Sequence, residues 1–305
     1  MHNEPRPAGQ LGATPPLIGI LHVHSNFSHD GRDRIADLRA ASLARGIAFV
    51  GLTDHAEDLG SERFDRLRRE CDDHSDASVR LIPGAEFRFP GYPGLHLLAI
   101  GLHRWIEAAS PAELAAAAAE HAELVAVAHP RLFDYELPPA VAARVHAIEV
   151  WNAAHDTRYL PDPRAVTLLR HVRRTNPHVV GFAGLDQHDA RNDRRARVVV
   201  DPGERNPLSA IREGRFTNRG CTMQFSPGLG WGPVRLGLLY GARAVYDVME
   251  RVQERAARAL ARSRQPAAPA ASPSTQPAAA AASLERYRRR LAEAEEREAA
   301  MHERH

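Results

Sequence analysis

Short apolar runs alternate with helix-like stretches from Leu17 to about residue 200. The apolar runs predict strands at 17–23, 47–52, 79–86, 95–102, 124–128, 147–151, 179–185 and 196–200. Apolar residues at helical spacing predict helices at 33–45, 61–73, 111–122 and 162–174, and Gly46 is well placed to end the first of them. Strands and helices that alternate this regularly are typical of an α/β protein with a parallel sheet.

A closed or nearly closed barrel of strands and helices fits this pattern and length best. A doubly wound open sheet is the alternative. No glycine-rich GxGxxG loop follows a predicted strand, which disfavours the open sheet.

The two ends of the chain differ from this regular region. Residues 1–16 are polar and rich in proline, and we expect a disordered lead-in before a barrel domain at 17–235. An amphipathic helix is predicted at 236–263, a Pro/Ala/Ser linker at 264–282 and a charged helix at 283–305. We interpret the last helix as solvated because its apolar stripe is thin. The alternative is a weak docking or oligomerisation helix.

The composition limits the class of protein. A hydrophobic content of 44% over 305 residues allows a sizeable core, and a net charge of +2 gives no strong nucleic-acid signal. Two cysteines, Cys71 and Cys221, are too few for a disulfide framework and predict reduced thiols in a cytoplasmic protein. We expect neither a secretory leader nor a membrane span. The informative excess is 17 histidines.

His22 and His24 end the first predicted strand. Side chains alternate along a strand, so these two imidazoles are expected to point to the same side. At the carboxyl end of a barrel strand they would lie in the mouth, where active sites form. Two imidazoles on one face can chelate Zn, Mn or Fe. An HxH pair alone is a weak signal, since a solvent-facing pair is common.

Four further strands end in the same kind of residue. Each motif has a plain structural alternative, such as a turn residue, a core histidine or a helix cap. Their joint occurrence at successive strand ends favours one metal-binding cluster. The motifs are Thr53-Asp54-His55, Gly84-Ala85-Glu86, Ala128-His129-Pro130 and Asp186-Gln187-His188.

A hairpin argument adds one more histidine. If the segment between Glu86 and His96 turns near Gly91, these two residues lie opposite one another. We therefore favour His96 as a co-ligand, and His103 at the far end of the same strand is the alternative.

In this order the motifs, with Asp30-Gly31 after the first, resemble the polymerase and histidinol phosphatase (PHP) family of metallohydrolases. The resemblance covers about residues 17–220. It implies a distorted (β/α)7 TIM-like barrel, here with a C-terminal helical extension, and a site for two or three metal ions. The adjacent His29 leaves the register at Asp30 open. The ligand positions implied by the resemblance are His22, His24, Asp30, His55, Glu86, His96, His129, Asp186 and His188.

Six imidazoles and three carboxylates could hold two or three divalent ions of Mn, Zn or Fe. Such ions would acidify a water molecule into the nucleophile and neutralise phosphate oxygens. Asp186 is the candidate catalytic residue, because it can bind a metal and also hold or accept the proton of that water. Asp54 and Glu149 could orient imidazoles, although ordinary turn or cap roles fit them equally well.

Arg158 and Arg191 lie near these motifs and are candidate phosphate-binding residues, with a solvated surface arginine as the alternative. The predicted function is a metal-dependent hydrolase, a phosphoesterase that acts on a small phosphate monoester, a nucleotide or a short oligonucleotide. One alternative is a PHP-like scaffold that has lost catalysis. The other is a multi-metal hydrolase of a non-phosphate substrate such as an amide or a lactone.

Overall fold

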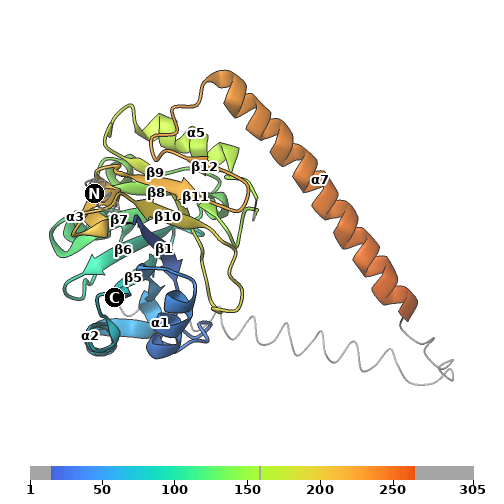
Figure 1. Cartoon of the computed structure of the whole chain (residues 1–305). Helices are drawn as coiled ribbons and strands as arrows, with labels where there is room; N and C mark the ends of the chain where they lie inside the picture. The colour runs from blue at the N-terminus through green and yellow to red at the C-terminus, as the bar shows by residue number, and fades with distance from the viewer. Residues whose placement is uncertain (1–14, 158, 265–305) are drawn as a thin grey trace, which may run out of the picture. The chain divides into compact units, whose positions relative to one another are not determined.

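The computed structural model describes residues 15–157 and 159–264. The first compact unit ends at Tyr246. The described part of the second unit, residues 247–264, is helical. The elements up to residue 127 are β1 (Leu17–Val23), α1 (Ile35–Ala44), β2 (Phe49–Leu52), β3 (Asp54–His55), α2 (Ala56–His74), β4 (Arg80–Ile82), β5 (Gly84–Arg88), β6 (His96–Leu102), α3 (Pro111–His121) and β7 (Ala122–Val127). They are followed by η1 (Pro130–Phe133), α4 (Pro139–Ala142), β8 (Ala147–Asn152), α5 (Pro163–Val172), β9 (Val180–Gly184), β10 (Arg197–Val200), α6 (Pro207–Arg212), β11 (Phe216–Arg219), β12 (Gln224–Phe225) and α7 (Pro233–Arg264) (Figure 1).

The strands form two six-stranded sheets with the orders β12-β11-β10-β1-β2-β4 and β3-β5-β6-β7-β8-β9. Both sheets are mixed, so the expectation of parallel pairing holds only in part. β1, β2 and β4 are parallel, as are β3 and β5, and β7, β8 and β9, whereas β6 runs antiparallel to both of its neighbours, β5 and β7. The connection from β5 to β6 is too short for a helical crossover, and a short connection can only join antiparallel strands.

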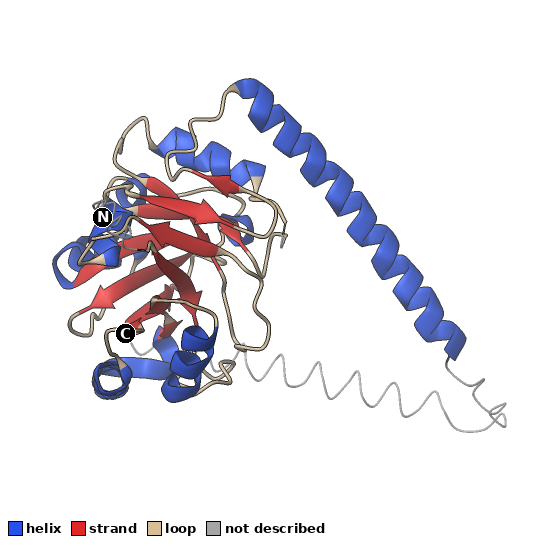
Figure 2. Cartoon of the chain, viewed as in Figure 1, coloured by secondary structure: helices blue, strands red, loops and turns tan. Residues whose placement is uncertain are grey.

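Backbone hydrogen bonds join the two sheets where β1 and β9 end. Leu185 N donates to Leu21 O over 3.0 Å, and His24 N donates to Gln187 O over 2.8 Å. Helices lie around this arrangement of strands (Figure 2). The mixed α/β fold with its long C-terminal helix is therefore observed, and the closed seven-stranded barrel stays a prediction.

The strands bury side chains on both faces, which explains their nearly continuous apolar sequences. In β6, Leu97 and Ala99 join the larger core cluster, which includes Phe64 of α2, and Leu98 and Ile100 join a second cluster. Leu21, Phe49 and Phe182 belong to this second cluster. Glu86 pairs across the sheet with Leu98, so its carboxylate is on the face that carries the second cluster.

Several boundaries differ from the expectations. The strand expected at 79–86 is divided into β4 and β5 at Pro83, whose missing N–H cannot continue the ladder. The helix expected at 61–73 begins already at Ala56 and is interrupted by Gly60, at φ 62°. α7 begins at Pro233, three residues before the helix expected at 236. The strands β11 and β12 were not expected.

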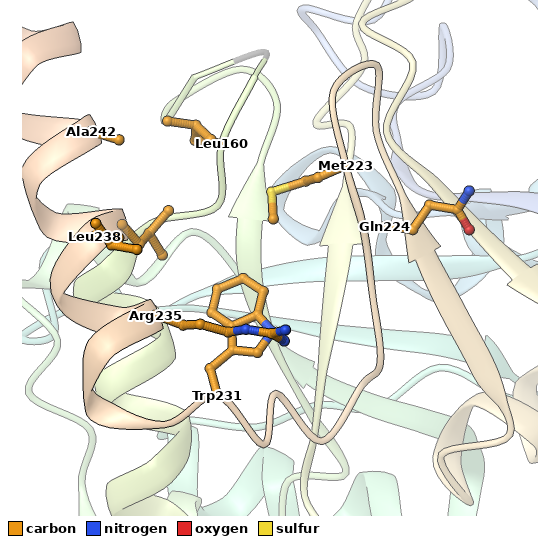
Figure 3. A pocket seen from close by; sticks show the side chains of 8 residues that line it. Leu160, Met223, Gln224, Trp231, Arg235, Leu238 and Ala242 are labelled. Carbon is orange, nitrogen blue, oxygen red and sulfur yellow. The ribbon is translucent and has the colours of Figure 1, made fainter.

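The first turns of α7 border an apolar cavity of about 320 Å³. Trp231, Met223 and Leu160 line it from the loops, and Leu238 and Leu239 line it from the helix (Figure 3). None of the described helices is both long and apolar enough to span a bilayer. Most of the expected lead-in, residues 1–14, lies outside the described residues, as do the charged helix and all but the first residue of the linker.

Gly84 offers a test of the packing between the sheets. A Cβ atom at this position would lie 2.5 Å from the carbonyl oxygens of Ala99 and Leu52, and neither backbone can move cheaply. We expect Gly84→Ala to lower the free energy of unfolding by about 1–3 kcal/mol. Gly230→Ala is the control, since its Cβ would meet nothing within 4 Å, and the expected change is within about 0.5 kcal/mol. Urea unfolding measures both, and equal losses in the two variants would contradict the packing described.

Candidate metal centre

Glu86 lies at the centre of the site, and its side chain is 1% exposed. Its Oε2 atom is 3.3 Å from Nε2 of both His22 and His24. Its Oε1 atom is 2.6 Å from Nδ1 of His96 and 3.0 Å from Nε2 of His129. Oε2 is also 3.6 Å from Nδ1 of His55, so each oxygen of this one buried carboxylate faces its own set of imidazoles.

Asp186 is the second buried carboxylate, with a side chain that is 4% exposed. Its Oδ1 atom is 3.5 Å from Nε2 of His22 and 3.4 Å from Nε2 of His24. Its Oδ2 atom is 3.0 Å from Nε2 of His155 and accepts a hydrogen bond of 3.3 Å from Asn152. Like Glu86, Asp186 has a different set of neighbours at each oxygen.

Asp30 closes the site on the solvent side. Its Oδ2 atom is 3.2 Å from Nε2 of His55 and 3.1 Å from Nε2 of His188. The ring of His188 stacks on that of His24, with centroids 4.3 Å apart and planes inclined by 6°. His29 instead pairs with Asp58, so Asp30 is the residue that the chain brings to the cluster.

Four overlapping groups of these side chains bring their ligand atoms within 4.8 Å of one another. The groups are His24, Asp30, His55 and His188; His22, Glu86 and His129; His22, His24 and Asp186; and His129, His155 and Asp186. Because the groups share members, they offer several adjacent positions that could hold a metal ion, and the number of groups does not give the number of ions.

The backbone around the site is strained at three of these residues. His22, His129 and Asp186 have φ values of 64°, 24° and 48°, in the left-handed region that non-glycine residues rarely adopt. At His22 the pairing of β1 with β2 shifts register, which marks an irregularity in the strand. Strain of this kind is typical of functional sites, where the surrounding structure holds the side chains in place.

The electrostatics of the cluster reflect the two carboxylates. Burial lowers the pKa of His24, but the carboxylates of Asp186 and Glu86, which face its Nε2 atom, outweigh it and raise the pKa to about 9. Burial also opposes ionisation of Glu86, but the charge of His22 and the neighbouring imidazoles of His129 and His24 hold its pKa well below the usual value. Without metal, positively charged imidazoles therefore balance the buried carboxylates.

Glu149 was expected either to orient an imidazole or to have an ordinary turn or cap role, and its contacts agree with the first. Its Oε1 atom is 3.1 Å from Nδ1 of His22, and its Oε2 atom accepts a hydrogen bond of 2.7 Å from the backbone N–H of His129. A carboxylate on the second ring nitrogen sets the orientation of a ligating histidine. Asp54 has the other role: it accepts hydrogen bonds from Ser25 and Ser28 and holds the loop after β1.

The structure brings all the sequence-predicted ligand positions together. His96 is not a member of the four groups, but its Nδ1 atom is 2.6 Å from Oε1 of Glu86, whereas His103, the alternative, is exposed. The expected hairpin register is wrong by two residues, because His96 pairs with Arg88 and Glu86 pairs with Leu98. A shift of two keeps both side chains on one face, so His96 still reaches Glu86 as a diagonal neighbour.

The structure gives less support to the two predicted phosphate-binding arginines than to the predicted metal ligands. Arg158 lies outside the described residues. Arg191 is bound through Nε and an Nη atom to the carboxylate of Asp189, and its side chain is 79% exposed. Its role in phosphate binding stays a prediction. Two arginines that the sequence did not single out, Arg32 and Arg194, line a cavity of about 410 Å³.

This cavity also reaches Asp30, Asp186 and His188, so it opens directly onto the cluster. His155 is a further residue that the sequence analysis missed. The sequence held one weak sign of it, a histidine three residues after the strand end at Asn152.

The residues at the site fit divalent ions. His24 Nε2 and His55 Nδ1 are buried and make no hydrogen bond, although both face Glu86. Buried polar atoms are normally paired, so such atoms at a cluster of carboxylates and imidazoles are explained by an ion between them. Imidazole and carboxylate donors suit Zn, Mn and Fe.

Comparisons with known proteins point to one family. Residues 21–144 match the family model described as PHP domain. A segment of 82 residues is 42% identical to an error-prone DNA polymerase of Symbiobacterium thermophilum and covers 27% of this chain and 7% of that protein. A segment of 103 residues is 31% identical to a probable histidinol-phosphatase of Thermotoga maritima and covers 31% of this chain and 43% of that protein. The matched segments thus span less than half the length of both relatives.

A solved structure from Bacteroides vulgatus, a two-domain protein that contains a predicted PHP-like metal-dependent phosphoesterase, has a TM-score of 0.52 to this chain. It is 20% identical over 72% of this chain and 70% of that chain, a similarity that shows a shared fold. Residues 21–144 of this chain therefore match the PHP domain, and the shared fold and the buried cluster of histidines and carboxylates agree with that match.

Proposed function

We propose that this protein is a metal-dependent phosphoesterase that hydrolyses a small phosphate monoester, a nucleotide or a short oligonucleotide. The observation that carries the proposal is the pair of buried carboxylates, Glu86 and Asp186, each with different donors at its two oxygens. This arrangement suits carboxylates that bridge adjacent ions of a cluster of two or three. The match of residues 21–144 to the PHP domain supports the same chemistry.

The proposed ligands are the predicted positions that converge in the structure. We further propose that the two sheets form the distorted seven-stranded barrel implied by the family resemblance. The hydrogen bonds between β1 and the segment after β9 support this closure. In such a barrel the cluster would lie at the mouth, above the core that contains Leu98 and Ile100.

The side chains have separate tasks in this proposal. Bound divalent ions supply a Lewis acid that acidifies water and neutralises phosphate oxygens. Asp186 holds the attacking water and accepts its proton, and Asn152 keeps its carboxylate oriented through the hydrogen bond to Oδ2. Glu149 fixes the ring of His22 and accepts a hydrogen bond from the backbone N–H of His129. Arg32 and Arg194 lie on the cavity wall, where guanidinium groups can bind the phosphate of an entering substrate.

The alternatives make different demands on these residues. A scaffold that had lost catalysis would not need to keep every ligand position, whereas here all of them lie together, with His96 joined through its contact with Glu86. A hydrolase of amides or lactones would use the same metal centre without needing arginines on the cavity wall. Phosphate esters tested beside a lactone and an amide therefore separate the proposed function from the third possibility.

The first prediction from this proposal concerns the metal content of the protein. Protein purified without chelator is expected to carry at least two equivalents of Zn, Mn or Fe per chain, because several overlapping groups of ligand atoms are present. Elemental analysis measures this, and Glu86→Gln should lower the content, because Glu86 faces several imidazoles. Less than one equivalent in the wild type, with no uptake from added metal, would exclude the proposed centre.

The second prediction concerns proton release. A ligating imidazole must be neutral, and His24, with a pKa of about 9 in the metal-free protein, is mostly protonated at pH 7. Metal binding at pH 7 should therefore release at least one proton per chain. Metal affinity should rise with pH until about pH 9 and fall as the solution becomes more acidic. Calorimetric titration of stripped protein in two buffers of different ionisation enthalpy counts the protons, and equal heats in both would refute the expectation.

The third prediction concerns turnover. Asp186→Asn keeps the volume and the contact with Asn152 but removes the charge that accepts a proton. We expect kcat on a phosphate ester, with saturating Mn, to fall about 10²–10⁴-fold. Asp201→Asn changes an exposed carboxylate after β10 and should leave kcat unchanged. Wild-type turnover in Asp186→Asn would show that another group accepts the proton.

A further inference from the structure

His155 lies beside the metal centre but outside the set of ligand positions predicted from the sequence. It follows β8, and its side chain is 40% exposed. Its Nε2 atom is 3.0 Å from Oδ2 of Asp186, and its ring meets that of His129 edge-on at a centroid distance of 5.1 Å. His155 therefore covers the oxygen of Asp186 that His22 and His24 do not face.

The loop after β8 holds His155 in this position through one buried side chain. Asn152 Oδ1 accepts hydrogen bonds of 2.8 Å and 2.9 Å from the backbone N–H groups of Ala154 and His155. The amide nitrogen of the same side chain donates to Glu149 and Asp186. One amide thus links the backbone of His155 to two carboxylates of the centre, which fixes the distance between the imidazole and Asp186.

The donor atoms around Oδ2 of Asp186 match a metal position. His129, His155 and Asp186 place ligand atoms within 4.8 Å of one another. Two imidazoles and a carboxylate are the donors of many catalytic zinc sites, which leave a further position open for water or substrate. The partial exposure of His155 places this position on the solvent side of the centre, where such an opening is needed.

We propose that His155 is a direct metal ligand, which binds one divalent ion together with His129 and Asp186. On this proposal Asp186 bridges two ions: Oδ1 serves the ion at His22 and His24, and Oδ2 serves the ion at His155. The inference rests on the proposed metal centre, but not on the class of substrate that the protein hydrolyses.

Two simpler roles for His155 predict different behaviour. It could only form an ion pair with Asp186, or it could contact substrate without touching a metal. The variant His155→Gln distinguishes these roles, because an amide still donates a hydrogen bond to Asp186 but is a poor ligand for transition metals. His103→Gln is the matched control, since His103 is an exposed histidine outside the four groups of possible ligands.

The experiment uses the full chain, stripped of metal by chelator, with Co²⁺ alone as the probe. Equilibrium dialysis gives the equivalents bound and their affinities, and the visible absorption of bound Co²⁺ reports its ligands. In His155→Gln we expect one equivalent to bind at least about tenfold more weakly, with a changed absorption spectrum. His103→Gln should match the wild type in both measurements. Circular dichroism first verifies that each variant is folded, and His155→Ala serves as a second variant.

Wild-type Co²⁺ affinity and spectrum in both His155 variants would overturn the inference, whatever happens to activity. A raised KM with unchanged metal binding would assign His155 to substrate contact instead. Failure of the wild type itself to bind Co²⁺ would exclude the proposed metal centre as a whole. Binding by the wild type and both variants alike would exclude only the role of His155.

Discussion

The structure depends on keeping two carboxylates ionised in a place that water scarcely reaches. An isolated buried carboxylate costs several kcal/mol even after the surroundings relax, so Glu86 and Asp186 need positive charge on every open side. Imidazoles meet this need in two ways. Protonated imidazoles carry the positive charge themselves, and neutral imidazoles bind metal ions that carry it. The site therefore remains balanced with or without metal.

Further buried polar groups around the site fix the positions of the side chains that balance these charges. Glu149 and Asn152 connect the ring of His22 and the backbone N–H of His129 to Asp186, and each makes more than one contact within the site. Asp54 ties down the loop after β1 through Ser25 and Ser28. Groups with several partners resist small displacements, since a shift that improves one contact weakens another. The strained backbone at His22, His129 and Asp186 is held by the same contacts.

The mixed pairing of the strands decides how ligands from distant segments meet. Parallel strands bring their carboxyl ends to one edge, which accounts for His22, His24 and His129. β6 is antiparallel to its neighbours, so its first residue, His96, lies at the edge where the neighbouring strands end. A ligand at the start of one strand and ligands at the ends of others therefore belong to one site.

The sequence by itself determined most of the strands and helices up to β10 and the places of the His, Asp and Glu residues at strand ends, because apolar periodicity and the short His/Asp/Glu motifs are local properties. It suggested the hairpin of β5 and β6, but it did not determine the register that pairs His96 with Arg88, the antiparallel pairing of β6 with β7, or the strands β3, β11 and β12. These depend on which segments lie side by side, and strand pairing is a property of the whole sheet. For the same reason only the tertiary structure revealed His155, which lies three residues beyond a strand end and reaches Asp186 through a turn held by Asn152. A local pattern specifies which residues share a face, but contacts between residues far apart in the sequence decide which of those faces meet.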